Sequence, residues 1–187
     1  MTTASLLQEL RAATRDAHDR LELGVDVLER CRSTASYAAL LTGFRSVYRP
    51  LEQALDAAAV TAGVVPDWPL RHKTGWLDED LEALGHLPGP DAQVPPVTTA
   101  EDVAGVLYVM EGATVGGALV VRELERTPAP PPHRFFASYG PRRGAMWHAF
   151  RGRVDALEQS GADRAAVVAA ARSTFATLER ACLQPTR

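Results

Sequence analysis

Apolar residues recur every three or four positions along most of the chain, which is the spacing of amphipathic helices. The first helical segment spans about 5–30, and Thr2, Thr3 or Ser5 could cap its start. Its apolar positions are Leu6, Leu7, Leu10, Ala13, Ala17 and Leu21. Charged residues stand between them, so one face of this helix is expected to pack on a core and the other to meet solvent.

A second long helix is predicted over about 37–61, with Pro50 expected to bend it. Its inward positions are Leu40, Leu41, Phe44, Val47, Tyr48, Leu51 and Leu55. Turn chemistry over 63–69 then breaks the pattern, and a shorter helix over 73–84 follows, with Gly85 as its C-cap. A second break, the proline-rich connector 87–97, leads to the next helix.

That next helix opens with a capping box over 98–102 and runs to about residue 126. The prolines in 127–133 predict an exposed loop, and a short aromatic segment over 134–140 comes after it. Two more helices are expected, over 144–159 and from about 161 to 182. Because no segment alternates with a period of two and no repeat is visible, the sequence predicts one all-α domain over 1–187, with about six or seven helices.

The helix after the connector carries an unusual run of glycines: Gly112, Gly116 and Gly117. Each glycine inside a helix costs about 1 kcal/mol relative to alanine. Gly112 and Gly116 are one turn apart and share a face. A flat ligand or a crossing helix could use that bare strip, and the sequence leaves both explanations open.

Charge narrows the possible partners. The net charge of −3 and the pI near 6.0 argue against a nucleic-acid-binding protein, which usually has a basic face.

The N-terminus has no apolar run like that of a signal peptide, and no later segment is expected to span a membrane. Cys31 and Cys182 lack metal-like spacing and are predicted to be reduced thiols. We therefore expect a cytoplasmic protein without a membrane partner.

One histidine has a setting suited to metal binding. Arg11, His18 and Glu22 form a line along one face of the first helix, flanked by small alanines. A carboxylate four residues on can accept the Nδ1 proton and so present Nε2 to a metal. The same spacing also fits a half-exposed histidine with an ordinary acidic neighbour. Both interpretations remain at this point.

The remaining motifs exclude several classes of site. A di-iron bundle would need Glu-x-x-His pairs, and the sequence contains none, nor an HExxH motif, a P-loop or a dinucleotide fingerprint. One unpaired histidine points instead to a metal that brings most of its own ligands, as haem does.

Three stretches together resemble the haem oxygenase family, and within it the bacterial members associated with bacteriophytochromes. Residues 10–22 are similar to the family's proximal helix, residues 107–117 to its distal helix, and residues 135–151 to the segment that leads into a later helix. The resemblance covers nearly the whole chain and rests on the order and spacing of the three stretches.

The resemblance implies a helical bundle that holds haem between a proximal and a distal helix. Its activity would be the opening of the haem ring to biliverdin, with release of Fe2+ and CO, at the expense of O2 and electrons from an external donor. A ferredoxin or a reductase would be that redox partner, and a bacteriophytochrome is one candidate acceptor of biliverdin.

The resemblance also assigns roles to residues. His18 would be the axial iron ligand and Glu22 its hydrogen-bonded support, while Gly112, Gly116 and Gly117 would be the distal glycines. Further residues would bind the haem propionates; these are Arg11, Tyr108 and Arg151, with Arg153 as the alternative to Arg151. Many family members have an aspartate after the first distal glycine, where it orders water that supplies protons. This chain has Ala113 there, so backbone carbonyls, together with Thr114, would have to order that water.

Two rival functions stay open on the sequence. The same pocket could serve a protein that binds or senses haem without turnover, or the glycine strip could belong to a helical scaffold that only packs on a partner. The sequence does not determine which meso carbon is attacked, which protein donates electrons, where biliverdin goes, or the oligomeric state.

Overall fold

A computed structural model describes residues 4–62 and 65–183, with the side chains of 59–62 left out. These residues form helices and no strand. The α-helices are α1 (Leu6–Val25), α2 (Val27–Arg30), α3 (Thr34–Ala62), α4 (Thr74–Ala83), α5 (Ala100–Leu124), α6 (Arg134–Ala137), α7 (Arg143–Gln159) and α8 (Arg164–Leu183). Two short 3-10 helices, η1 (Trp68–Leu70) and η2 (Gly140–Arg142), join them. The prediction of an all-α fold is confirmed.

The first helix begins where the sequence indicated and ends earlier. The Ser5 hydroxyl accepts the backbone N–H of Gln8, and the Gln8 side chain accepts the N–H of Ser5, which completes a capping box. Asp26 then adopts a left-handed conformation, with φ at 33°, and stops α1. The predicted helix over 5–30 is therefore two helices, α1 and α2. Thr2 and Thr3 lie outside the described residues.

Other boundaries follow their local chemistry. Pro50 lies inside α3, and Gly85, with φ at 72°, follows the last turn of α4 as predicted. Thr99 and Asp102 form the capping box of α5. The predicted aromatic segment after the prolines contains the short helix α6, which the sequence did not indicate.

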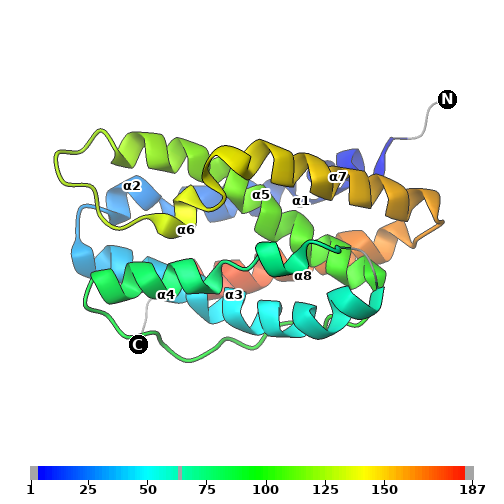
Figure 1. Ribbon diagram of the computed structural model, residues 1–187, viewed down its shortest axis with the longest axis horizontal. Coiled ribbons are helices and arrows are strands. Elements are labelled where there is room, and N and C mark those ends of the chain that lie inside the picture. The colour runs from blue at the N-terminus through cyan, green and yellow to red at the C-terminus, as the bar shows by residue number, and fades with distance from the viewer. Residues whose placement is uncertain (1–3, 63–64, 184–187) are drawn as a thin grey trace.

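Helix α8 is the centre of the bundle, because α1, α3 and α5 all pack on it. Figure 1 shows α5 crossing the molecule obliquely between α7 and α3. A Cβ added at Gly105 would lie 2.4 Å from the backbone oxygen of Val167, so glycine is what permits the crossing of α5 and α8. The close helix crossing of α5 is therefore at Gly105, while Gly112 and Gly116 have open space beside them.

The length and hydropathy of α5 correct the expectation that no segment is long and apolar enough to span a membrane. Its mean hydropathy of 1.6 over an 18-residue window makes it long and apolar enough to cross a membrane by composition alone. In this fold 56% of that window is buried inside the protein. Apolar residues such as Val103, Leu107 and Met110 face the other helices, which explains the composition as that of a core helix.

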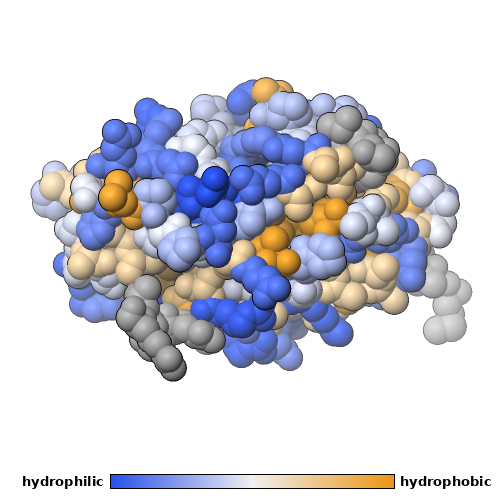
Figure 2. All heavy atoms as spheres, turned by 90° about the horizontal axis from the view of Figure 1, so that it is seen from below, coloured by the Kyte–Doolittle hydropathy of each residue, from blue (hydrophilic) through white to orange (hydrophobic). Residues whose placement is uncertain are grey.

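The connector 86–98 contains no helix and runs along the side of the molecule formed by α3 and α4. Figure 2 views this side, where polar residues interrupt the apolar ones. Arg45 of α3 fixes the connector, because its guanidinium donates to Asp78 of α4 and to Asp91. The connector is therefore packed against α3 and α4 on this side of the bundle.

Candidate functional site

The glycine-bearing part of α5 has one open face. A Cβ added at Gly112 or at Gly116 would meet no atom within 4 Å outside the helix. Val115 and Leu119 lie on the same side, one turn apart, and are 46% and 55% exposed. Tyr108, one turn before Gly112, is half-buried. We call these five residues the slot face of α5.

Exposure of this kind has a physical meaning. The two glycines leave the backbone accessible. The two large apolar side chains beside them are exposed to water, which is unfavourable by comparison with burial. A flat apolar molecule laid on the slot face would cover both. Of the two explanations for the glycines, a helix crossing within the described chain does not apply at Gly112 or Gly116, because a Cβ there would meet no atom of another segment within 4 Å.

Gly117 does not belong to the slot face. It is buried, and a Cβ there would lie 2.6 Å from the backbone oxygen of Phe136. Glycine is required at this position because α6 packs directly on the backbone of α5. The sequence grouped Gly117 with the other two glycines, and the structure corrects that grouping.

Helix α1 carries His18, the predicted iron ligand. Both α1 and α5 pack along α8, and each also contacts α7, but they make few contacts with each other. His18 of α1 is 59% exposed at its side chain and meets the Phe175 ring of α8 edge-on, with 6.3 Å between ring centroids. The histidine is therefore held at the border of the α1–α8 interface and stays open to a ligand.

Two carboxylates lie beside His18 Nδ1. Asp19 Oδ1 is 3.4 Å from that nitrogen, and Glu22 Oε2 is 3.7 Å from it. The Glu22 distance is longer than a hydrogen bond, so the support predicted from Glu22 is an electrostatic contact in this structure. Asp19 is nearer, and the sequence analysis missed it. Its only signal was its place directly after the histidine.

The three side chains could in principle bind a metal ion among themselves, because their nearest ligand atoms lie within 4.8 Å of one another. All three are exposed. Since both carboxylates face Nδ1, the arrangement leaves Nε2 free to bind an iron that already has four ligands.

The predicted propionate-binding residues come from three helices. Arg11 is exposed on α1 and shares a face of that helix with His18. Tyr108 lies on the slot face of α5. Arg151 and Arg153 are exposed on α7, which packs on both α1 and α5. The structure thus brings the three helices together, and both arginines of α7 remain candidates.

Two residues bear on proton supply. Ala113 is exposed and carries no polar group, as the sequence indicated. Thr114 is buried, and its hydroxyl donates to the backbone oxygen of Glu111 at 2.7 Å. The Thr114 proton is therefore already used on the inner side of α5, so Thr114 is not placed to order water at the slot face.

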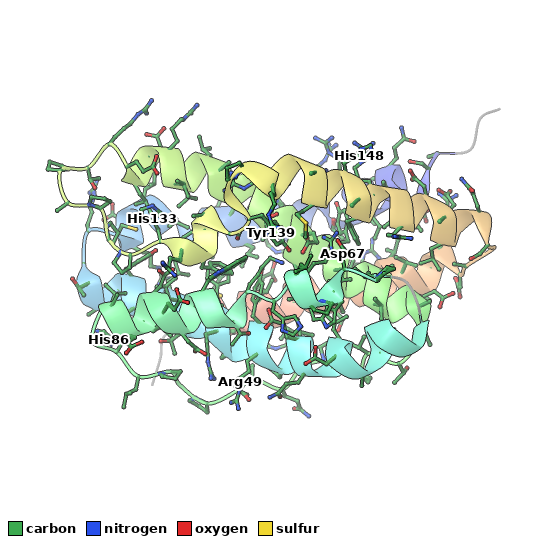
Figure 3. All side chains as sticks on the ribbon, in the orientation of Figure 1. Arg49, Asp67, His86, His133, Tyr139 and His148 are labelled. Carbon is green, nitrogen blue, oxygen red and sulfur yellow. The ribbon has the colours of Figure 1, made fainter. Side chains whose placement is uncertain are left out.

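The structure reveals a buried ionic cluster behind the slot face, formed by Arg71, Lys73, Glu111 and Tyr139. Glu111 accepts hydrogen bonds from the other three side chains, at 2.7 Å in each case. Figure 3 places Tyr139 near the centre of the molecule, with Asp67 close by in the same view. The sequence analysis missed this cluster, although a single acid in an otherwise apolar stretch directly before Gly112 was a usable signal.

Burial and charge set the protonation of this cluster. Burial raises the pKa of Tyr139, and the adjacent Glu111 carboxylate raises it further, so the phenol keeps its proton and donates it. Burial lowers the pKa of Lys73, and Glu111 opposes that effect. The Lys73 Nζ donates hydrogen bonds to Glu111, to Tyr139 and to the backbone oxygen of Arg71.

The other histidines do not join the site. In Figure 3, His86, His133 and His148 come from three separate regions of the molecule. His72 pairs with Asp56 at 3.0 Å, and its ring lies tilted against that of Trp68. The absence of a shared motif among them agrees with their scattered positions in the described chain.

Comparison with known proteins gives a consistent result. The protein-family model described as heme oxygenase matches residues 4–183. A heme oxygenase of Xanthomonas campestris pv. campestris (strain 8004) is 32% identical over 143 residues, which is 75% of this chain and 85% of that protein.

Two solved structures share the fold. The NO- and CO-bound heme oxygenase of Neisseria meningitidis superposes with a TM-score of 0.79 at 22% identity, covering 96% of this chain and 92% of that one. The heme oxygenase of Leptospira interrogans gives a TM-score of 0.75 at 17% identity, covering 96% and 99% respectively.

Proposed function

The chain belongs to the haem oxygenase family, and we propose that it performs the family's reaction with haem held between His18 on α1 and the slot face of α5. Bound haem supplies both the iron that activates O2 and the ring that is opened to biliverdin, with release of Fe2+ and CO. The protein's part is to bind, orient and shield it.

The observation that carries this proposal is the open space at Gly112 and Gly116. A flat ring can lie at backbone distance only where no Cβ stands between, and Val115 and Leu119 would be covered by the same ring. The close backbone would also block part of the space above the ring, so one meso edge is more accessible than the others.

In this proposal His18 would hold the haem iron. Asp19 and Glu22 both lie beside Nδ1, so the other ring nitrogen, Nε2, is the one that would hold the iron. Carboxylates beside a ligand histidine also fix the orientation of its ring. A histidine would be a weaker electron donor to the haem iron than a thiolate would be.

Arg11 and one arginine of α7 are proposed to bind the two propionates, with Arg151 as the first choice and Arg153 as the alternative. A bidentate guanidinium suits a carboxylate, and two such contacts fix the rotation of the ring in its own plane. Tyr108, at the end of the slot face, is a further donor within this arrangement. The rotation decides which meso edge is presented.

Proton supply is assigned to water ordered by backbone carbonyls at the glycines. Ala113 offers no acid, and the Thr114 hydroxyl is occupied by Glu111 O. A carbonyl whose neighbour is glycine stays accessible to water because no side chain covers it. This part of the proposal gives Gly112 and Gly116 a second role beyond the close approach.

The electron donor is proposed to be an acidic protein such as a ferredoxin or its reductase. From Arg126 to Val154 the chain contains six arginines and no acid, although the whole protein has a net charge of −3. Arg142, Arg151 and Arg153 are exposed on η2 and α7. A positive surface of this kind steers an acidic partner to that side. A bacteriophytochrome remains a candidate acceptor of biliverdin.

We also infer that the protein works in a reducing compartment, the cytoplasm. Cys31 and Cys182 are both free thiols. Such thiols persist where glutathione keeps cysteines reduced.

Reconstitution with hemin tests the function. The purified protein is loaded with one equivalent of hemin and then given ascorbate, or a ferredoxin with its reductase, in air. We expect a Soret band that fades as biliverdin absorption grows and CO is released. A Soret band that persists under both donors would identify a haem-binding protein without turnover, and no Soret band at all would leave a helical scaffold; either result contradicts the proposal.

A further inference from the structure

The buried cluster of Arg71, Lys73, Glu111 and Tyr139 holds α5 on its buried side, about a quarter of a turn around the helix from the slot face. Glu111 stands directly before Gly112, and its side chain is fully buried while Gly116, further along the same helix, is exposed. Successive residues of a helix are turned by about 100°, so one short stretch presents a charged anchor inward and a bare backbone outward.

The cluster connects α5 to several other segments. Arg71 donates to Glu111 at 2.7 Å, to Asp67 at 2.8 Å and to the backbone oxygen of Met146 on α7 at 3.2 Å. Lys73, at the N-terminus of α4, donates to Glu111 and to Tyr139, which precedes η2. The position of α5 is thereby fixed against α4, α7 and the α6–η2 junction at once.

The part of α5 that contains Gly112 and Gly116 needs contacts that fix its position. Glycine is a poor helix former, and nothing packs against Gly112 or Gly116 from the open side. Apolar contacts on the inner side alone would tolerate small shifts and rotations of the helix. Hydrogen bonds between charged groups are directional, so they favour one arrangement over its neighbours.

We propose that this cluster is a positioning device for the haem reaction, in which Glu111 sets the rotation and height of the glycine stretch over the ring. This inference rests on the proposed function for its role, although its structural part does not require haem. Glu111 and its three partners are buried in the protein interior, so they act through the backbone of α5.

Amide hydrogen exchange in the haem-free protein tests the structural part. Tyr139→Phe removes only the hydroxyl that donates to Glu111. The matched control is Tyr48→Phe, because Tyr48 is equally buried but its hydroxyl has no hydrogen-bond partner among the described residues. We expect exchange at residues 112–117 to quicken by about tenfold to a hundredfold in Tyr139→Phe and to stay near wild type in Tyr48→Phe.

A second variant removes the anchor without leaving a lone buried charge. Glu111→Gln alone would leave two cations facing a neutral amide and could fail to fold. The double variant Glu111→Gln, Lys73→Met removes one charge of each sign and leaves Arg71 opposite Asp67. Its control is Arg45→Met, which removes the buried guanidinium that pairs with Asp78 of α4 and with Asp91 of the connector.

The hemin-loaded variants test the role in the reaction. We expect Tyr139→Phe and the double variant to shift the pH at which the ferric spectrum changes from its acid to its alkaline form, and to alter the ratio of biliverdin isomers. Both quantities depend on the distance between the α5 backbone and the ring. Arg45→Met should lower thermal stability and leave both unchanged.

The outcomes separate this inference from the proposed function. Unchanged exchange at 112–117 in both cluster variants overturns the inference even if haem is turned over normally. Faster exchange with unchanged spectra and isomer ratio reduces the cluster to a stabilising element and likewise overturns the positioning role. Failure of the wild-type protein to degrade haem would overturn the proposed function, while the exchange result would still stand.

Discussion

Gly116 and Gly117 are neighbours in the chain, yet a side chain added at each would meet opposite surroundings. At Gly116 a Cβ would find no atom within 4 Å, whereas at Gly117 it would lie 2.6 Å from the backbone oxygen of Phe136. One helix therefore uses two adjacent glycines for two purposes, ligand access and close packing of α6.

This difference predicts how alanine acts at each position. Gly112→Ala and Gly116→Ala should leave the free energy of unfolding of the haem-free protein unchanged or raise it by up to about 1 kcal/mol each, because alanine is the better helix former. The same changes should weaken hemin binding, since the methyl group enters the slot. Urea unfolding and hemin titration measure the two effects.

Gly117→Ala should behave in the reverse manner. Its methyl group overlaps the Phe136 carbonyl, so the haem-free protein should lose about 1–3 kcal/mol of unfolding free energy. Equal losses of stability at Gly116 and Gly117 would contradict the assignment of the two glycines.

His18→Ala is expected to abolish the histidine-ligated ferric spectrum, because α1 contains no other histidine. His148→Ala is the control, as His148 is exposed on α7. Optical and electron paramagnetic resonance spectra of the hemin complex check both variants. A histidine-type spectrum retained in His18→Ala would rule out this ligand.

The carboxylates beside His18 should tune its affinity. Replacing both by amides, as in Asp19→Asn with Glu22→Gln, is expected to weaken hemin binding by about tenfold to a hundredfold, the usual effect of losing a partner of a metal-bound histidine. Because Asp19 is nearer Nδ1, Asp19→Asn alone should have the larger effect of the two single changes. A larger effect of Glu22→Gln would restore the role first expected for Glu22.

Arg151→Ala and Arg153→Ala distinguish the two propionate candidates. An exposed ion pair contributes about 0.2–1 kcal/mol, so the correct arginine should change hemin affinity by up to about fivefold and should change the isomer ratio of biliverdin. The effect should shrink at high salt. Arg32→Ala, an exposed residue paired with Glu29, is the control.

The two cysteines should resist alkylation in the folded protein. Burial raises the pKa of Cys31 to about 11 and that of Cys182 to about 12. An acid whose pKa is raised stays protonated over a wider range, so near pH 8 both thiols are almost entirely neutral, and reactive thiolate appears only as the pH approaches these values. Iodoacetamide labelling followed by mass spectrometry should modify the half-exposed Cys31 first and Cys182 only on unfolding.

Much of the fold followed from local pattern. The apolar spacing located every long helix, and the capping box at Thr99 and Asp102 lies where the sequence placed it. The error at the first helix arose because Asp26, in a left-handed conformation, is not among the residues that most often end helices. Such boundaries depend on how the chain must turn to reach the next packed segment.

The sequence by itself determined the all-α class, the family and the candidate ligand His18, because these depend on periodicity and on residues close together along the chain. Only the tertiary structure decided which glycines are open, since Gly112, Gly116 and Gly117 look alike until α6 and α8 are in place. It alone also brought Arg71, Lys73 and Tyr139 to Glu111, from segments up to 40 residues away in sequence. Contacts of that kind depend on how helices pack in space, and no local pattern encodes them.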